Sequence, residues 1–476
     1  MENDTLSTEG GLTLELLATS IDTCFLLVTT FCIFAMQTGF LLLEAGSVRD
    51  HASRTIMLKN ICDGCFGAVA WYLMGYSVLN NFSSQKVFLN DVSSFVNFFQ
   101  SFAFAITTCT IISGGVACRI KFSFYMIYSF IMVAWIYPVV AFWAWDSNGW
   151  ISARGYKDFA GSGPVHLIGG VSALIGTTFL KPRLHRFEKV LETGEIRDRG
   201  IKGHSDKMVI LGSMILWCGW FAFNASSSGS ITNKESLELT MRAVMNTMIA
   251  SGAAGVSGVI ASQYFLKKQS IGFLMNAILG GLVAITAGCS YVGTSAALGI
   301  GAVSPLLTYA TSTILPNKFH IDDPLDATAV HGVNGAFGVI VVGLFDMEKG
   351  FFITGNADLL GIQVLAVTVM IAWSATFAAL YFGLLGKFVQ MRVKRDYELM
   401  GSDFYYCDGL EFADKLDAFD IMAHNEVEQA KNRVRARGQR ELLRRTKSER
   451  ASLNRSHSAI DIRKTAQVQP MSTLKK

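Results

Sequence analysis

Two histidines stand at the head of apolar segments in similar surroundings. His166 lies within "DFAGSGPVHLIGG" (158–170) and His331 within "DATAVHGVNGAFG" (326–338). Each is preceded by an aspartate and followed four residues later by a glycine, namely Asp158 and Gly170, then Asp326 and Gly335. An ionisable group inside an apolar span usually marks an ion or substrate path. A lone histidine would more often pack against a carbonyl, but the symmetric pair favours two facing rings that share one proton.

The composition indicates which elements position these rings. Of 476 residues, 51% are hydrophobic and 16% are charged, and the mean hydropathy is +0.37. This is too apolar for a soluble protein of this size and typical of a polytopic membrane protein. The predicted fold is all-α with eleven transmembrane helices, near 22–46, 58–80, 96–117, 122–144, 163–180, 207–226, 240–265, 271–289, 293–315, 327–346 and 361–390. An odd number of helices places the termini on opposite sides of the membrane.

The histidine motifs open the fifth and tenth of these helices. The sequence therefore predicts two repeats of five helices, 22–180 and 207–346, followed by an eleventh helix, 361–390. Five crossings reverse the side on which the second repeat begins, so the repeats are inverted. Inverted repeats usually place a transport site near the membrane midplane, at their mutual interface.

The loop charges predict the orientation. With the C-terminus in the cytoplasm, the inner loops hold sixteen basic residues and the outer loops hold five, as the positive-inside rule requires. The residues before the first span are acidic, which argues against a cleaved signal peptide. Asn3 and Asn81 begin Asn-x-Ser/Thr sequons on the outer side and are glycosylation candidates.

Three regions follow from this topology. Residues 1–21 are an extracellular N-terminal segment, 22–392 form the transport domain, and 393–476 form a basic cytoplasmic tail. The tail is predicted to be solvated, with a role at anionic lipids as the alternative. Three serines follow arginines and are phosphorylation candidates: Ser448, Ser452 and Ser458. The sequons and the tail favour a eukaryotic plasma membrane.

The cysteines predict neither a disulfide framework nor a metal site. Most of the nine lie in or beside apolar segments, where packing explains them. Cys62 and Cys65 form a Cys-x-x-Cys pair without the second pair that a zinc site needs. No cofactor and no nucleic-acid partner are expected.

Four segments carry a resemblance to a known family. They are "MQTGFLLLEAGSVR" (36–49), "DFAGSGPVHLIGG" (158–170), "GWFAFNASSSG" (219–229) and "DDPLDATAVHGVNGAFG" (322–338). In this order they resemble the ammonium transporter family (Amt/Mep), within the clan that also includes the Rh proteins, over residues from about 20 to about 400. "DFAGS" and "FNASS" are similar to the Amt branch. The resemblance implies a homotrimer of eleven-helix protomers, each with its own pore.

The resemblance also implies an outer substrate site. Phe104, Trp145 and Ser227 would bind ammonium, and Phe104 and Phe223 would form a phenyl gate beneath it. Aromatic faces attract a small cation by about 0.5–2 kcal/mol, and a serine hydroxyl accepts an N–H hydrogen bond. Without the resemblance, core packing would explain the phenylalanines, and Trp143 or Trp150 could replace Trp145, or all three could form an interfacial belt.

Other residues would support or line the pore. His166 and His331 would line it, with Trp220 and Asn224 supporting the site. Asp158 resembles an aspartate thought to shape the outer site from behind, and N-capping of the fifth helix is the alternative role.

The sequence departs from the family pattern at three places. Pro164 stands where an aliphatic residue is usual, which is compatible with a first helical turn. Ser226 replaces a glycine and would add a hydroxyl beside Ser227. The tail keeps "MGSDF" (400–404), but "YYCDG" follows it, which puts tail-mediated gating in doubt.

The predicted function is ammonium transport. Ammonium, with methylammonium as its analogue, would leave its proton at the outer site, and ammonia would pass a hydrophobic pore lined by the two histidines. Co-transfer of the proton is expected, and the sequence leaves open whether the histidines relay it or only line the path. The alternatives are an ammonium sensor with little conduction and a membrane redox protein with His166 and His331 as haem ligands.

Overall fold

The computed structural model describes residues 13–81, 94–189 and 195–407. Asn3, Ser448, Ser452 and Ser458 lie outside these residues, and so do the last two residues of the Asn81 sequon. The helices are α1 (Leu14–Ser47), α2 (Ser53–Ala70), α3 (Tyr76–Leu79), α4 (Phe95–Val116), α5 (Phe122–Ile131), α6 (Tyr137–Trp145), α7 (Ile168–Leu180), α8 (Asp206–Ala225), α9 (Lys234–Ala261), α10 (Ile271–Thr286), α11 (Thr294–Phe319), α12 (Asn334–Phe345), α13 (Phe351–Thr354), α14 (Asp358–Ala378), α15 (Arg395–Met400) and α16 (Ser402–Tyr406). Strands β1 (Phe187–Lys189) and β2 (Ile196–Asp198) pair antiparallel.

π-Helical turns extend or join several of these helices. They are η2 (Trp71–Gly75), η4 (Met132–Ile136), η6 (Ser162–Leu167), η8 (Ser262–Leu266), η9 (Thr328–Val333) and η10 (Ala379–Leu384). Turn η6 leads into α7 and turn η9 leads into α12. Each of these two turns carries one of the predicted pore histidines.

Within the described residues, nine helices are long and apolar enough to cross a membrane. The chain is thus a multi-pass membrane protein of helical fold. Two of the eleven predicted spans lie outside this set. One is α10, which has 16 residues, and the other is the continuous helix of α2, η2 and α3, which buries Lys59 and Asp63. The count of eleven therefore stays a prediction.

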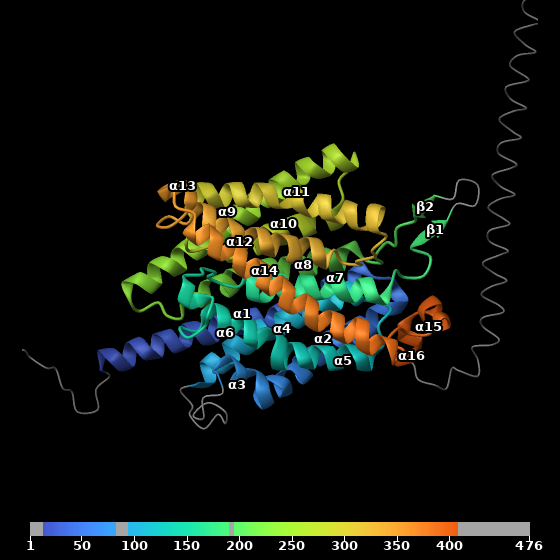
Figure 1. Ribbon diagram of the computed structural model, residues 1–476, viewed down its shortest axis with the longest axis horizontal. Coiled ribbons are helices and arrows are strands. Elements are labelled where there is room, and N and C mark those ends of the chain that lie inside the picture. The colour runs from blue at the N-terminus through green and yellow to red at the C-terminus, as the bar shows by residue number, and fades with distance from the viewer. Residues whose placement is uncertain (1–12, 82–93, 190–194, 408–476) are drawn as a thin grey trace, which may run out of the picture. The chain divides into compact units, whose positions relative to one another are not determined.

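The chain divides into two units, residues 1–407 and 408–476. In the first unit the long helices lie side by side, with α1 packed along α8, α9 along α11, and α4 against α7 (Figure 1). Strands β1 and β2 and helices α15 and α16 lie at one end of these helices, and α13 lies at the other (Figure 1). We call the end with β1 the Asp326 end and the end where α6 stops the Trp145 end.

Helix starts follow ordinary capping chemistry. The side chains of Thr13, Ser205, Asn233 and Ser270 accept hydrogen bonds from the first turns of α1, α8, α9 and α10. Such caps satisfy backbone N–H groups that have no partner within the helix. They explain why these helices begin where polar residues interrupt the apolar segments.

The two histidine-bearing segments cross at glycines. A Cβ atom built on Gly170 would lie 2.2 Å from the backbone nitrogen of Gly332, and one on Gly335 would lie 2.7 Å from the carbonyl oxygen of Ser162. Only glycine permits backbones to approach this closely. The glycine four residues after each histidine therefore allows the two segments to pack against each other.

Buried charges tie the Asp326 end together. Arg183 donates to both carboxylate oxygens of Asp322, at 2.7 and 2.8 Å, and the fully buried Arg119 donates to the Asp322 carbonyl at 2.7 Å. Burial alone would raise the pKa of Asp322, but the hydrogen bonds and charge of Arg183, together with the charge of Arg119, hold this pKa well below its usual range. The loop before η9 is thereby fixed to the end of α7.

Residues of the "MGSDF" segment also contact the bundle. The carboxylate of Asp403 accepts hydrogen bonds from the backbone of Arg54 and Thr55, at 3.1 and 2.7 Å, and from the Thr55 hydroxyl at 2.7 Å. These bonds satisfy N–H groups in the first turn of α2. The segment after α14 is therefore attached to the membrane-spanning part by its acidic residue.

Candidate functional site

A cavity of about 370 Å³ opens at the Trp145 end. It brings together four of the residues singled out in the sequence, Phe104, Trp145, Asp158 and Ser227, from α4, α6, the loop before η6 and the turn after α8. The other lining residues are Leu79, Gln100, Ser101, Tyr137, Phe159 and Tyr291. The cavity therefore combines aromatic faces with a few polar groups.

Asp158 occupies the base of the loop that enters η6. Its carboxylate accepts hydrogen bonds from the backbone of Gly161, Ser162 and Gly163, at 2.6, 3.2 and 2.8 Å, and from the Tyr156 hydroxyl at 3.0 Å. Burial raises the pKa of Asp158, although these hydrogen bonds oppose the rise. The side chain thus caps η6 and also lines the cavity, so the two roles considered from sequence are geometrically compatible.

The backbone of Asp158 orients Trp145. The indole Nε1 of Trp145 donates to the Asp158 carbonyl at 2.8 Å, and its ring meets Phe104 edge-on with centroids 6.3 Å apart. Trp143 and Trp150 contact each other at 5.9 Å and do not line this cavity. Of the three tryptophans, Trp145 is the one that lines the cavity.

Two stacked phenylalanines lie beneath the cavity. The rings of Phe104 and Phe223 are 4.1 Å apart at an interplanar angle of 22°. Phe223 is fully buried and Phe104 is 6% exposed. The Phe223 ring lies 5.7 Å from His166, so these two rings separate the cavity from the first histidine.

The two histidines contact each other directly. Their Nδ1 atoms are 3.2 Å apart and form a hydrogen bond, with ring centroids 5.3 Å apart. His166 is fully buried, and its Nε2 has no hydrogen-bond partner among the described residues. His331 is 7% exposed, and its ring lies 6.4 Å from Phe40. Pro164 lies inside η6 and is compatible with this contact.

The predicted supporting residues hold α8 in place. The Trp220 ring stacks on His166 at 4.9 Å and 16°, and its Nε1 donates to Thr286 of α10 at 2.8 Å. Asn224 donates to the Thr247 hydroxyl of α9 at 2.8 Å. Ser226 is fully buried and its hydroxyl donates to the Phe223 carbonyl, so it does not line the cavity that Ser227 lines.

Comparisons with known proteins show which family the chain belongs to. A profile of the Ammonium Transporter Family matches residues 24–410. Ammonium transporter 1 member 3 of Solanum lycopersicum is 33% identical over 425 residues, covering 81% of this chain and 91% of the relative. Ammonium transporter Amt2 of Archaeoglobus fulgidus is 32% identical over 415 residues, covering 80% and 86%. The chain belongs to the ammonium transporter family.

Solved structures agree with this membership. The structure described as "Sensor Amt Protein" has a TM-score of 0.76 and 29% identity, covering 83% of this chain and all of that chain. Mep2 of Candida albicans has a TM-score of 0.70 and 24% identity, covering 79% and 87%, which supports the fold alone. The relatives are transporters, and the chain is accordingly not an enzyme.

The Asp326 end of this family member has two cavities of its own. One, of about 350 Å³, is lined by Asp206, Asn276, Ser312 and Asp326 among others. The other, of about 20 Å³, lies beside His331 and is lined also by Phe40, Glu44 and Asn276. Asn276 lines both, so the two cavities adjoin.

Asp326 does not repeat the role of Asp158. Burial raises its pKa to about 6, helped by the charge of Asp323. Asp323 instead caps η9, because its carboxylate accepts from the backbone of Ala327 and Thr328, at 3.1 and 2.8 Å. The Asn276 amide donates to Asp326 at 3.0 Å.

Sequence reasoning missed several residues of these cavities. Tyr291 and Gln100 lie far from the recognised motifs along the chain, and no local pattern identifies them. Glu44 had a signal, because an acidic residue inside the apolar run "GFLLLEAGS" is expensive unless it has a role. Phe40, from the same run, was indistinguishable from the other apolar residues of α1.

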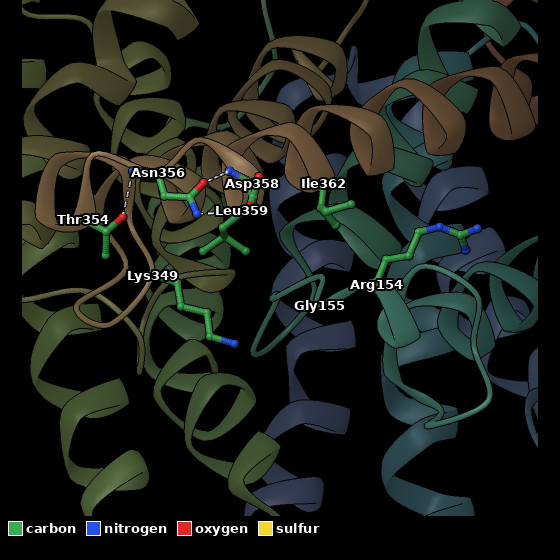
Figure 2. A pocket seen from close by; sticks show the side chains of 8 residues that line it. All are labelled: Arg154, Gly155, Lys349, Thr354, Asn356, Asp358, Leu359 and Ile362. Carbon is green, nitrogen blue, oxygen red and sulfur yellow. Dashed lines mark hydrogen bonds between the residues drawn. The ribbon is translucent and has the colours of Figure 1, made fainter.

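A further cavity, of about 400 Å³, involves none of the predicted site residues. Figure 2 shows its lining residues, including Arg154, Lys349 and Asp358, with Asn356 hydrogen-bonded to Thr354 and Asp358. The Arg154 guanidinium points away from Lys349 (Figure 2) and donates to the Trp150 carbonyl. This cavity lies apart from the stacked rings of Phe104 and Phe223 that lead to the histidines.

Proposed function

We propose that the chain transports ammonium by binding it in the cavity at the Trp145 end and passing ammonia to the Asp326 end. The ammonia would pass the rings of Phe104, Phe223, His166 and His331 in that order. The observation that carries this proposal is the hydrogen bond between His166 and His331, 3.2 Å long, directly beneath the stacked Phe104 and Phe223. Such a polar pair within an apolar passage can interact with ammonia where the phenylalanines cannot.

The cavity chemistry suits a small cation. The faces of Trp145 and Phe104 supply cation–π attraction, worth about 0.5–2 kcal/mol depending on desolvation. The Ser227 hydroxyl accepts an N–H hydrogen bond. Methylammonium retains three of the N–H donors and serves as a usable analogue.

Selectivity arises at the phenylalanine stack. A potassium ion that enters it loses hydration that apolar rings do not replace, whereas ammonium can leave its proton behind. The paired Nδ1 atoms need one proton between them, so one ring donates and the other accepts. This tautomeric pairing permits a proton to pass from one ring to the other, and transport is then electrogenic.

The remaining features of the proposal concern assembly and location. We place the Trp145 end outside and the Asp326 end in the cytoplasm of a plasma membrane, with the protomers in a homotrimer and surrounded by lipid. The two histidine segments are the matching parts of inverted repeats. Asn3 and Asn81 are the glycosylation candidates, and the three tail serines are the phosphorylation candidates.

Purified protein in proteoliposomes tests the function. An ammonium gradient should drive a current and an internal pH change, whereas a potassium gradient should drive neither. His166→Ala/His331→Ala should reduce the current by about 100-fold, because positioned proton transfer contributes about 10²–10⁴ to a rate. His204→Ala, which alters a histidine in the loop before α8, serves as the matched control and should leave both signals unchanged.

The outcomes separate the two histidine roles. An ammonium-specific pH change without current would mean that the pair lines a neutral pore. Equal responses to ammonium and potassium, or no response in the native protein, would contradict the proposed function.

An ammonium sensor is the second candidate, favoured by the similarity to the structure described as "Sensor Amt Protein". A sensor binds ammonium in the same cavity but conducts little. The sensor function would be favoured if the native protein bound methylammonium saturably but showed no flux, and if Ser227→Ala lost this binding.

The haem alternative fits the geometry poorly. Two nitrogens that bind one metal from opposite sides are about 4 Å apart, since metal–nitrogen bonds are about 2 Å. The Nδ1 atoms of the pair are 3.2 Å apart and are hydrogen-bonded to each other. A Soret band in the purified protein would reverse this conclusion.

A further inference from the structure

Glu44 is a buried carboxylate near the C-terminal end of an apolar helix. It lies in α1 and is 1% exposed. Its Oε2 accepts a hydrogen bond of 2.7 Å from the Ser113 hydroxyl, but its Oε1 is buried and has no hydrogen-bond partner among the described residues. A buried carboxylate oxygen that lacks a partner is costly. Ordinary helix packing therefore does not explain this residue.

The same side chain lines a small cavity with His331. The cavity measures about 20 Å³, and about 10–15 Å³ of such volume suffices for one water molecule. Glu44, Asn276 and His331 supply polar groups around it, as does Thr110, and a buried water commonly makes about three hydrogen bonds. Since Nδ1 of His331 is engaged with His166, Nε2 is the ring atom left to face a further partner.

One added proton would neutralise the formal charge of the buried cluster around Glu44. Lys59 and Asp63 of α2 interact electrostatically with it, and both are buried. Two carboxylates and one ammonium give this cluster a formal charge of −1. Asp63 has both oxygens engaged, with Tyr125 at 2.6 Å and Ser129 at 2.8 Å. Within the described residues, the Glu44 Oε1 is the carboxylate atom of this cluster that remains available.

We propose that Glu44 accepts the proton that leaves His331, through one water molecule in this cavity, and releases it into the larger cavity that Asp326 lines. This relay rests on the proposed transport function and extends it beyond the histidine pair. Asn276 borders both cavities together with Leu43 and Leu325, so its amide is the polar group that they share between Glu44 and the Asp326 end.

The relay is balanced at each step. Ammonium gives a proton to Nε2 of His166, while the Nδ1 proton of His166 moves to Nδ1 of His331. The Nε2 proton of His331 then passes to the water, and a proton of that water passes to Oε1 of Glu44. Ammonia travels separately and recovers a proton at the Asp326 end. No electrons are exchanged.

Glu44→Gln tests the relay because it keeps the size and removes the acid. We expect the ammonium-driven current to fall about tenfold or more, while the pH change caused by ammonia entry stays within about twofold of native. Asp63→Asn is the matched control: it removes the same charge from the same cluster but does not line the cavity, and its current should stay close to native. Gel filtration and melting in detergent check that both variants fold.

The other outcomes contradict the relay. An unchanged current in Glu44→Gln, a folded Glu44→Gln protein that loses both signals, or equal current losses in both variants would each overturn it. If Glu44→Gln does not fold, Glu44→Asp withdraws the carboxylate by one methylene, and an unchanged current there would equally overturn it. If the native protein gave an ammonium-driven pH change without a current, the relay would be refuted but ammonia conduction through the pore would not. If the native protein gave neither signal, the proposed function itself would be refuted.

Discussion

The two histidine-bearing turns, η6 and η9, share a sequence pattern but are held in different ways. Upstream of η6, the carboxylate of Asp158 accepts hydrogen bonds from three backbone N–H groups and a tyrosine hydroxyl. Before η9 the capping is done by Asp323, which like Asp158 stands eight residues before its histidine, while the carboxylate of Asp326 accepts a hydrogen bond from Asn276. An aspartate eight residues before the histidine, Asp158 or Asp323, therefore fixes the backbone of each turn, and η9 has in Asp326 a further carboxylate beside a cavity.

The surroundings of the two histidine rings also differ, in their burial and in the residues that they contact. His166 is fully buried and contacts the rings of Trp220 and Phe223. His331 is slightly exposed and lines a cavity with Glu44. Under the proposed function, a cation would meet aromatic faces at the Trp145 end, whereas a proton would meet carboxylates at the Asp326 end. This asymmetry suits a path along which ammonium loses a proton and later recovers one.

The glycines at the crossing should give the largest effect. Gly170→Ala places a Cβ atom 2.2 Å from the Gly332 nitrogen, and the backbones must separate. Overpacking costs about 1–3 kcal/mol and occasionally more, so we expect a loss of folded protein in gel filtration. Gly332→Ala is the partner experiment, since its Cβ atom meets nothing closer than 3.4 Å, and it should fold. Equal behaviour of the two variants would show that the crossing is looser than these distances indicate.

Asp158→Ala should have the next largest effect. It removes the acceptor of three backbone N–H groups, and each buried group left without a partner costs about 1–3 kcal/mol. Because Trp145 and η6 are both positioned by this loop, ammonium-driven flux should fall more than tenfold, with a lower melting temperature. Asp326→Ala should retain most of the flux. If the two variants lost flux equally, the aspartates would act alike despite their different contacts.

Much of this arrangement could be predicted from the sequence, for identifiable reasons. The helical membrane fold follows from long apolar segments, and the pairing of His166 with His331 follows from their repeated surroundings. The glycine after each histidine was part of the same pattern, and the structure gives it a reason in the backbone crossing.

What could not be predicted depends on contacts between distant segments. Asp323 has the same spacing from its histidine as Asp158 and is the cap, but the positive φ of 55° at Asp326 and its place beside a cavity depend on the turn geometry. Tyr291 and Gln100 reach the cavity only through tertiary packing. Glu44 was visible as an acid in an apolar run, but its neighbours in α2 and η9 are known only from the fold.

The smallest effect concerns the ionisation of Asp326. Burial raises its folded pKa to about 6 from the ordinary 3.8, so the folded state prefers the neutral acid. The resulting stabilisation is complete below about pH 4 and is lost as the pH rises through about 6. Asp326→Asn mimics the neutral acid and tolerates the positive φ, because asparagine adopts this conformation more readily than most residues.

This variant should therefore match the native protein in melting temperature near pH 4 and exceed it slightly above about pH 7. Asp323→Asn supplies the contrast, since it weakens a cap and should lower the melting temperature at both pH values. A native-like melting temperature for Asp326→Asn at every pH would mean that this carboxylate is as well solvated as a surface group. The difference between the two turns would then lie in their capping alone.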